Sequence, residues 1–400
     1  MDFFNKTFRG DRTVWIIFIL LCIISLVEIF SATSTIVYKQ GNQWGPIIRH
    51  ALFLLTGFCG VMFLQRVPTR FFSLSIPILI ISWFFLILTL FMGEEVNGAQ
   101  RYLGFGAFSF QPSEIAKIAA IGAVAFFLSK TNKENESIMF KVIITGVLVT
   151  CGLIILDNLS TGILLFCVCF LMMIIGQVSW KRIGKITLSG ILIGSILFMA
   201  LSFIPEDTIK DKLPDRFGTW KSRIDKFLDS SSPNGVGGNI EEYNISENFQ
   251  ISHAKIAIAN GGIIGLPGSG TERDFLPQAY SDFIFAIILE EMGLIGGIVV
   301  MLLYFWLMIR VGMLARKCDK FFPKYLLLGS GLILTIQALI NMGVAVDLFP
   351  ITGQPLPLIS RGGTSTIITC AYFGIILACS NFKEKEHENV DEDIANIAYD

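Results

Sequence analysis

Long apolar segments alternate with short polar segments along almost all of the 400 residues. Segments of about 20 apolar residues cross a hydrocarbon core of about 30 Å when they form α-helices. The pattern therefore predicts an all-α polytopic membrane protein with about ten transmembrane helices. We expect these helices near residues 14–34, 47–65, 73–92, 112–129, 142–156, 159–178, 184–204, 282–309, 325–346 and 356–380.

The expected spans divide the chain into five parts. They are a cytoplasmic N-terminus at 1–13, transmembrane helices 1–7 within 14–204, an extracytoplasmic loop at 205–281, transmembrane helices 8–10 within 282–380 and a cytoplasmic tail at 381–400. Within the long loop, Arg216 and Arg223 alternate with aromatic and aliphatic residues, which is typical of a helix lying at the membrane interface. A second short helix is expected to end near Asn260, before a Gly-Gly pair.

Basic residues concentrate in alternate connections, and they predict the orientation because Lys and Arg are retained on the cytoplasmic side. The connections expected inside hold Arg66, Arg70, Lys130, Lys133, Lys141, Lys181, Arg182, Lys185, Arg310, Arg316, Lys317, Lys320 and Lys324. The short outer connections hold few. Both termini are therefore expected in the cytoplasm. The apolar run from Val14 is longer than that of a signal peptide, so we expect it to stay as the first span.

Composition agrees with a membrane protein, since 53% of residues are hydrophobic and only 16% are charged. A formal net charge of −1 argues against a nucleic-acid partner. None of the eight cysteines lies in an outer loop, so we predict no disulfide and no cysteine-based metal site.

Ionisable residues at membrane depth are the most informative, because each costs at least ~2.5 kcal/mol near a helix centre unless it is paired or hydrated. Pro112 suits the first turn of the fourth span, and Glu114 and Lys117 follow it at i,i+3 spacing. They can pair with each other. Either they form a structural ion pair that joins helices, or they form the charged wall of a cavity, and residue types alone favour neither interpretation.

Other charged residues are expected at the same outer level. Asp282 begins the eighth span, Arg101 precedes the fourth and Arg361 begins the tenth. A water-filled cavity that opens outward would accommodate all of them and suit a polar or anionic substrate. From the local pattern alone, Asp282 is more typical of a helix N-cap. Glu290 and Glu291, expected farther down a straight eighth helix, are candidates for a hydrated path or for buried pairing.

Four motifs containing these residues resemble the signatures of the SEDS family, which includes FtsW and RodA. They are "NGAQRYLGFGAFSFQPSEIAK", "ISHAKIAIANGGIIGLPGSG", "FLPQAYSDFIFAIILEEMGLIG" and "GQPLPLISRGGTS". They occur in the family's order, and the long outer loop before the eighth span is also the family's. The resemblance covers nearly the whole chain, and the sequence looks more like FtsW, the septal enzyme, than like RodA.

The resemblance implies a peptidoglycan glycosyltransferase that polymerises lipid II on the outer face of the bacterial cytoplasmic (inner) membrane. The family's essential acid matches Asp282 in "SDFIF", and its fourth-helix acid and base match Glu114 and Lys117. Three motifs depart from the family's pattern, and in one of them Tyr280 and Ser281 precede the motif acid where His and Thr are common. "DNLST" places Asn158 where the family has an acid, and "SRGGTS" adds Arg361 where tyrosine is frequent.

A carboxylate at Asp282 suits a general base for the acceptor hydroxyl, a role that contributes about 10²- to 10⁴-fold to the rate. The leaving lipid pyrophosphate requires positive charge, from basic side chains or from a divalent cation such as Mg²⁺ or Mn²⁺. Displacement by this route inverts the donor's configuration. The basic residues expected to bind the substrate are Arg101, Lys117, Lys255 and Arg361, with Arg216 and Arg223 possible on the loop.

Purely structural roles for the basic residues, and other functions for the protein, stay open at this point. Lys255 suits the polar face of a surface helix, and Arg361 suits an interfacial anchor. A lipid II flippase would also use buried charges along a path. A non-catalytic scaffold of the division complex would use the long loop to recruit partners. The family implies a class B penicillin-binding protein transpeptidase as partner, together with other division proteins.

Overall fold

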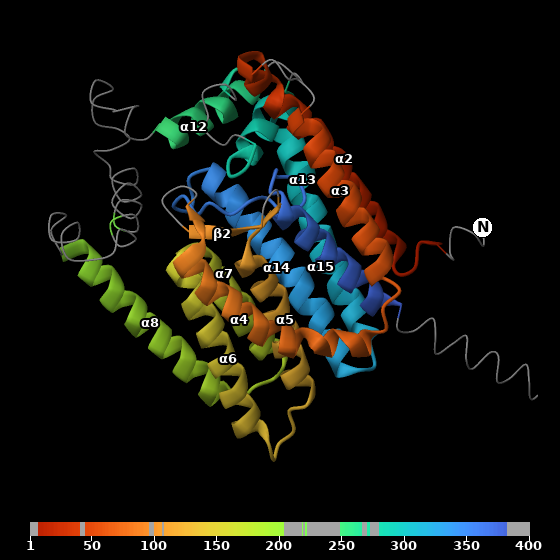
Figure 1. Cartoon of the computed structure of the whole chain (residues 1–400), viewed down its shortest axis with the longest axis vertical. Helices are drawn as coiled ribbons and strands as arrows, with labels where there is room; N and C mark the ends of the chain where they lie inside the picture. The colour runs from red at the N-terminus through yellow and green to blue at the C-terminus, as the bar shows by residue number, and fades with distance from the viewer. Residues whose placement is uncertain are drawn as a thin grey trace, which may run out of the picture.

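The computed structural model describes residues 7–40, 45–95, 100–105, 108–203, 218, 221, 249–265, 270–272 and 280–381. Within these ranges the long helices form one bundle (Figure 1). Seven of the described helices are long and apolar enough to cross a membrane: α2 (Arg12–Gln40), α3 (Gly45–Leu64), α4 (Ser75–Met92, preceded by the 3-10 helix η1, Thr69–Leu74), α5 (Pro112–Ser129), α6 (Glu136–Asp157), α13 (Ile284–Arg316) and α14 (Phe321–Ala345). Two shorter apolar helices are α7 (Leu159–Ile175) and α15 (Thr364–Ser380), and α8 (Trp180–Phe203) lies at the periphery (Figure 1).

Each expected span overlaps one of these helices, which confirms the all-α polytopic prediction. Several helices begin earlier than expected, for example α6 at Glu136 and α14 at Phe321. Hydropathy locates the part of a helix that fits an apolar layer, whereas the backbone stays helical through polar turns beyond it. The described helices alternate in direction, so connections 65–74, 130–135, 176–179 and 317–320 lie at one end, which we call the basic end.

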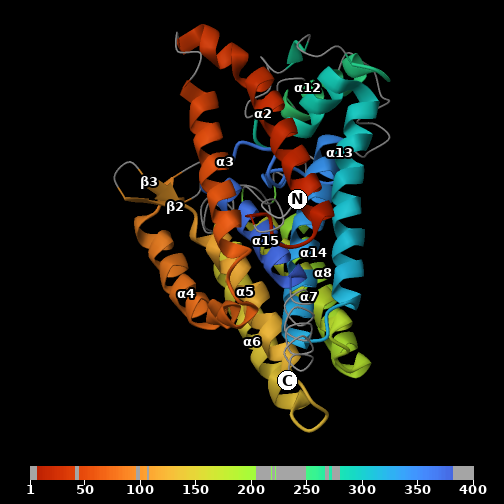
Figure 2. The ribbon, with the colours of Figure 1, turned by 90° about the vertical axis from the view of Figure 1, so that its right-hand side faces the viewer.

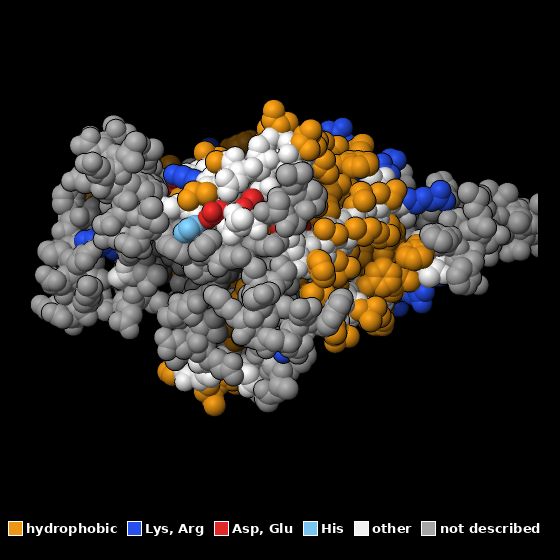
Figure 3. Space-filling model, turned by 90° about the horizontal axis from the view of Figure 1, so that it is seen from above, with side chains coloured by type: hydrophobic (Ala, Val, Ile, Leu, Met, Phe, Trp, Pro, Cys, Tyr) orange, Lys and Arg blue, Asp and Glu red, His pale blue; other side chains and the backbone are white. Residues whose placement is uncertain are grey.

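The outer surfaces of the helices are apolar and the interior is tightly packed. Exposed side chains include Phe63, Ile80 and Leu302, and hydrophobic side chains cover much of one side of the molecule (Figure 3). At the centre, α5 and α14 pack closely because a Cβ atom at Gly329 would lie 2.6 Å from Ile121 Cγ2. This arrangement suits a bundle surrounded by lipid.

The eighth helix is not straight. The break is at Gly293, whose φ of 68° and ψ of −172° are not helical, and α13 bends there (Figure 2). We call residues 284–292 the short arm and residues 294–316 the long arm. The long arm runs beside α2, since Arg310 Nε donates to Asp11 Oδ1 at 3.0 Å at the basic end, and Ser31 Oγ donates to Glu291 of the short arm just beyond the bend.

The bend changes the depth expected for Glu290 and Glu291. Ser31, the partner of Glu291, lies 19 residues after Arg12, or about 28 Å along α2 at 1.5 Å per residue. Asn341, which contacts Asp282, lies 20 residues after Phe321, or about 30 Å along α14. Arg310, which pairs with Asp11 next to the start of α2, lies six residues before the end of α13 at the basic end, so Glu291 is at least as far from that end as Asp282. The placement of Glu291 far below Asp282 is wrong because it assumed one straight helix.

The tenth helix also differs from expectation, since it begins at Thr364 and not near residue 356. Residues 351–363, the 351–363 segment, have no regular structure, and Leu358 and Gly363 adopt φ values of 70° and 54°. The segment nevertheless buries Leu356 and Ile359. Non-helical backbone at membrane depth is tolerated where protein surrounds it. The segment therefore brings polar backbone and side chains into the bundle.

A small antiparallel sheet between α4 and α5 was not anticipated from the hydropathy pattern. Its strands are β1 (Glu94–Glu95), β2 (Gln100–Phe105) and β3 (Phe108–Phe110), in that order, and Leu103 pairs with Phe110. β3 leads directly into Gln111 and the first turn of α5. The sheet therefore fixes where α5 begins.

The short helix expected to end near Asn260 is confirmed as α12 (Phe249–Gly261). It packs against the short arm without room for a side chain, because a Cβ atom at Gly261 would lie 1.8 Å from the Leu289 carbonyl oxygen. The interfacial helix expected around Arg216 and Arg223 lies outside the described residues.

Candidate active site

A cavity of about 200 Å³ lies at the end of the bundle opposite the basic end. Its walls come from β2, the starts of α5 and α7, the turn before α13 and the 351–363 segment with the start of α15. The lining residues are Tyr102, Gln111, Glu114, Asn158, Thr161, Tyr280, Ser281, Asp282, Gly353, Gln354, Pro355, Arg361, Gly362 and Ser365. Three predicted site residues, Glu114, Asp282 and Arg361, therefore lie in one cavity although they are far apart in the sequence.

Asp282 lies in a turn before the short arm. The N-cap of α13 is Phe283, and no side chain caps this helix. The interpretation of Asp282 as an N-cap is therefore wrong. Its carboxylate accepts a hydrogen bond from Ser281 Oγ at 3.0 Å, and Gly353 leaves room for it, since a Cβ atom there would lie 3.6 Å from Asp282 Oδ2.

Three successive backbone carbonyls hold this turn in place. The Tyr280 oxygen accepts from the Arg361 backbone N–H at 2.9 Å, and the Ser281 oxygen accepts from Ser360 Oγ at 2.6 Å. The Asp282 oxygen accepts from Asn341 Nδ2 at 2.9 Å. The turn is thus attached to α14 and to the 351–363 segment, and the Asp282 side chain is left to face the cavity.

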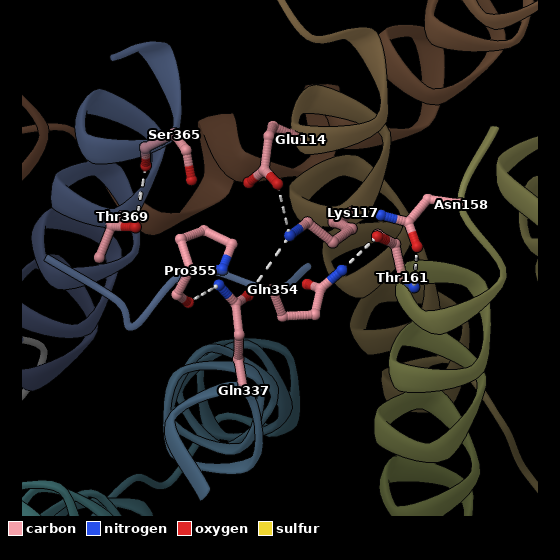
Figure 4. A network of polar contacts seen from close by, with 9 residues as sticks. All are labelled: Glu114, Lys117, Asn158, Thr161, Gln337, Gln354, Pro355, Ser365 and Thr369. Atoms are coloured by element: carbon pink, nitrogen blue, oxygen red, sulfur yellow. Dashed lines mark hydrogen bonds and ion pairs between the residues drawn. The ribbon is translucent and has the colours of Figure 1, made fainter. Parts of the chain in front are cut away.

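Glu114 and Lys117 pair as their spacing predicts. Lys117 Nζ lies 2.7 Å from Glu114 Oε1, and the exposed fractions of the two side chains are only 8% for Glu114 and 1% for Lys117. Lys117 Nζ also donates to Gln337 Oε1 at 3.4 Å, and Gln337 Nε2 donates to the Pro355 carbonyl at 2.9 Å (Figure 4). Glu114 lines the cavity as well, so the pair joins helices and contributes to the cavity wall at the same time.

The opposite wall is built around the start of α7. Asn158, which replaces the family's acid, is the N-cap of α7, and its Oδ1 accepts from the N–H groups of Ser160 at 3.1 Å and Thr161 at 3.4 Å. Gln354 Nε2 donates to Thr161 Oγ1 at 2.5 Å (Figure 4). An amide performs this capping without placing a carboxylate in the cavity.

Arg361 is the basic side chain that the described structure places in the cavity wall. Its guanidinium carbon lies 5.1 Å from the centre of the Tyr280 ring, which is a cation–π contact. Among the described residues, no acidic side chain forms an ion pair with Arg361. Its charge is therefore available to an anionic ligand.

The other predicted basic residues lie elsewhere. Lys255 is on α12, and its Nζ pairs with Asp347 Oδ2 at 2.6 Å, away from the cavity lining. The backbone of Arg101 belongs to β2, next to the cavity residue Tyr102, and its side chain is not among the described parts of the chain. Arg216 and Arg223 lie outside the described residues.

Glu290 and Glu291 do not line this cavity. They are buried at the bend of α13, where Glu290 Oε1 accepts from the N–H groups of Thr271 at 2.9 Å and Glu272 at 3.1 Å. Glu290 therefore fixes the loop before α13 against the helix bend, whereas Glu291 connects the bend to Ser31 of α2.

The described lining of the cavity offers two carboxylates, Glu114 and Asp282, as possible ligands of a metal ion. Over the ranges that the structure describes, no group of three His, Cys, Asp or Glu side chains has the arrangement needed to hold one. Glu114 is already paired with Lys117. The described side chains therefore form no closed protein cage for a divalent ion, and one or two carboxylates would suffice only where substrate phosphates supply the other ligands.

Sequence reasoning missed Ser281 and Gln354 in the cavity lining, and Ser360 as a support of the turn before α13. A signal was present, because the "GQPLPLIS" stretch places Gln354 and Ser360 in an apolar segment interrupted by two prolines. Prolines within an expected membrane helix indicate a break. Polar residues beside such a break are candidates for a cavity wall.

The fold and the cavity agree with comparisons to known proteins. A family model described as cell cycle protein, covering FtsW, RodA and SpoVE, matches residues 11–385. The chain belongs to this family, the SEDS family.

Curated relatives come from several branches of the family. Stage V sporulation protein E of Bacillus subtilis is 31% identical, over 94% of this chain and 99% of the relative. The probable peptidoglycan glycosyltransferase FtsW of Pseudomonas fluorescens is 29% identical, over 88% and 84%. The peptidoglycan glycosyltransferase MrdB of Escherichia coli is 28% identical, over 95% and 96%.

Solved structures support the fold over the same extent. One comes from work on the coordination of polymerization and crosslinking by a peptidoglycan synthase complex. It superposes with a TM-score of 0.70 at 24% identity, covering 93% of this chain and 97% of that chain. Thermus thermophilus RodA gives a TM-score of 0.64 at 23% identity, covering 93% and 96%. This chain is thus a multi-pass membrane protein with the family's fold.

Proposed function

We propose that the protein is a peptidoglycan glycosyltransferase that polymerises lipid II into glycan strands, with Asp282 as the general base. The observation that carries the proposal is the presence of a carboxylate, Asp282, and a cation without an acidic partner among the described residues, Arg361, in the walls of one cavity. Transfer of a sugar from a pyrophosphate needs both kinds of group. The names of the FtsW and MrdB relatives support the same activity.

The reaction forms one bond and breaks one. The 4-hydroxyl of the acceptor's GlcNAc attacks the anomeric carbon of the donor, and the bond from that carbon to the pyrophosphate oxygen breaks with inversion. Asp282 takes the hydroxyl proton as the new bond forms, a contribution of about 10²- to 10⁴-fold. The carbonyl contacts of residues 280–282 keep the carboxylate oriented for this step.

Arg361 stabilises the negative charge that develops on the leaving pyrophosphate. Its contact with the Tyr280 ring orients the guanidinium toward the cavity, and charge developing in a partly enclosed site is stabilised more strongly than in water. Lys117 is less suited to this task because Glu114 already compensates its charge. If a divalent ion is needed, it enters with the pyrophosphate.

The distribution of basic residues indicates how the protein lies in the membrane. We infer that the basic end faces the cytoplasm, because it carries Lys130, Lys133 and Lys317. Both termini then lie inside and the cavity opens in the outer half of the membrane. The undecaprenyl chain stays among lipids while its pyrophosphate reaches Arg361.

A transpeptidase is the proposed partner. One of the similar solved structures concerns a peptidoglycan synthase complex that coordinates polymerization and crosslinking. A class B penicillin-binding protein, with its single membrane helix packed against this bundle, would supply the second activity, and other division proteins would join it. Relatives of the FtsW, RodA and SpoVE types are 28–31% identical, so the septal role stays a prediction.

Reconstitution distinguishes this proposal from the flippase and the scaffold. Purified protein is incorporated into liposomes with labelled lipid II, with and without the transpeptidase, and the products are separated by size. A polymerase yields glycan strands. Exchange of label between leaflets without glycan supports the flippase, and the absence of both activities with the transpeptidase present supports the scaffold.

A further inference from the structure

The side-chain amide of Asn341 lies directly behind the turn that carries Asp282. Asn341 belongs to the last turns of α14, and only 1% of it is exposed. Its Nδ2 group donates one hydrogen bond to the Asp282 carbonyl at 2.9 Å and another to the Gln354 carbonyl at 2.8 Å. One NH₂ group thus uses both protons to join the turn before α13 to the 351–363 segment.

These two segments form adjacent parts of the cavity wall. Asp282 and Gln354 both line the cavity, whereas Asn341 does not. Asn341 therefore acts on the site through the backbone and not through contact with a ligand. A second link runs in parallel, because Ser360 Oγ donates to the Ser281 carbonyl at 2.6 Å and accepts from the Leu356 N–H at 2.7 Å.

We propose that Asn341 is a positioning residue for Asp282, and that Ser360 is its second support. The inference rests on the proposed function, in which Asp282 accepts the acceptor's proton. Loss of the Asn341 donor leaves two inward-facing carbonyls without their hydrogen bonds, so the turn shifts toward other donors or water. A displacement of about 1 Å at a catalytic group costs up to about 10²-fold in rate.

The hydrogen bonds of Asn341 predict how the activities of two substituted proteins should compare. Asn341→Asp keeps the shape of the side chain, but its carboxylate oxygen faces two carbonyl oxygens where a donor is required. Asn341→Ala removes the donor without adding repulsion. If Asn341 acts as a donor, the aspartate variant is at least as impaired as the alanine variant, whereas a role in packing alone gives the opposite order.

The test is a steady-state assay of glycan synthesis over a range of lipid II concentrations with the purified full-length protein. We expect Asn341→Ala to lower kcat about 10- to 100-fold with little change in KM. Asn341→Asp should be at least as slow, and Ser360→Ala should also lose kcat. The matched control is Ser330→Ala, a buried serine on the same helix whose Oγ has no hydrogen-bond partner, and it should retain wild-type kcat.

Normal kcat in both Asn341 variants overturns the inference, and so does an aspartate variant faster than the alanine variant. If the Asn341 variants do not fold, Ser360→Ala decides, and its normal kcat overturns the inference. Asp282→Asn is measured in parallel. If Asp282→Asn is active, the proposed function fails; if it is inactive while the Asn341 and Ser360 variants are normal, only the positioning role fails.

Discussion

Glu114 Oε1 and Lys117 Nζ lie 2.7 Å apart in the first turns of α5, yet only Glu114 reaches the cavity. Lys117 points away toward Gln337 on α14. The pair therefore links α5 to α14 and presents one partly neutralised carboxylate to the cavity. The two basic residues therefore have different roles. Lys117 holds helices together, and Arg361 remains available to substrate.

Replacing one residue of the pair should reduce the stability of the protein much more than replacing both. Lys117→Met leaves the Glu114 carboxylate buried without its partner, and breaking a buried pair costs about 3–5 kcal/mol. Adding Glu114→Gln removes the uncompensated charge and should restore most of the stability. Thermal unfolding in detergent measures both. A Lys117→Met variant as stable as wild type would show that the pair does not support the bundle.

Arg361→Gln should weaken substrate binding more than it affects folding. A hydrogen bond to a charged group contributes about 1.5–3 kcal/mol, which corresponds to about a 10- to 100-fold fall in kcat/KM for lipid II. Arg361→Tyr, which restores the family's frequent residue, tests whether the arginine is needed in this chain. The matched control is Lys255→Gln, because Lys255 pairs with Asp347 outside the cavity lining. Equal effects of Arg361→Gln and Lys255→Gln on kcat/KM would contradict the assignment.

Gly293→Ala should destabilise the protein by straining the bend of α13. The φ and ψ of Gly293 are accessible almost only to glycine, and a Cβ atom would also lie 2.4 Å from the Gly265 nitrogen. The backbone strain alone costs about 1–3 kcal/mol. Gly312→Ala on the same helix is the control, since its Cβ would meet nothing within 4 Å, and it should be neutral or stabilising. Equal unfolding temperatures for the two variants would show that the bend of α13 does not require glycine at position 293.

The sequence alone was sufficient for the spans and for part of the site. Apolar length determines which segments cross a membrane, and the charged residues Glu114, Asp282 and Arg361 all lie close to the same ends of their spans. Because those ends lie at one level, their meeting in one cavity followed from topology. The pairing of Glu114 with Lys117 followed from the i,i+3 spacing.

The remaining features depend on backbone geometry and on contacts between distant segments. Nothing local to Gly293 distinguishes it from a tolerated helical glycine until α12 and the loop before α13 pack against it. Lys255 has the composition of a substrate-binding residue, and only the fold brings Asp347 to it. Asn341 lies within an expected span, and its two acceptors became identifiable only once the 351–363 segment had been located inside the bundle.

The central claim is that the Asp282 carboxylate performs the chemistry. The most direct measurement compares glycan strands made from lipid II by purified wild-type protein and by Asp282→Asn, after both have shown the same unfolding temperature. The substitution keeps the shape of the side chain and the carbonyl contact to Asn341 but removes the base. We expect folded Asp282→Asn protein that makes no detectable polymer, and polymer made at the wild-type rate would contradict the claim.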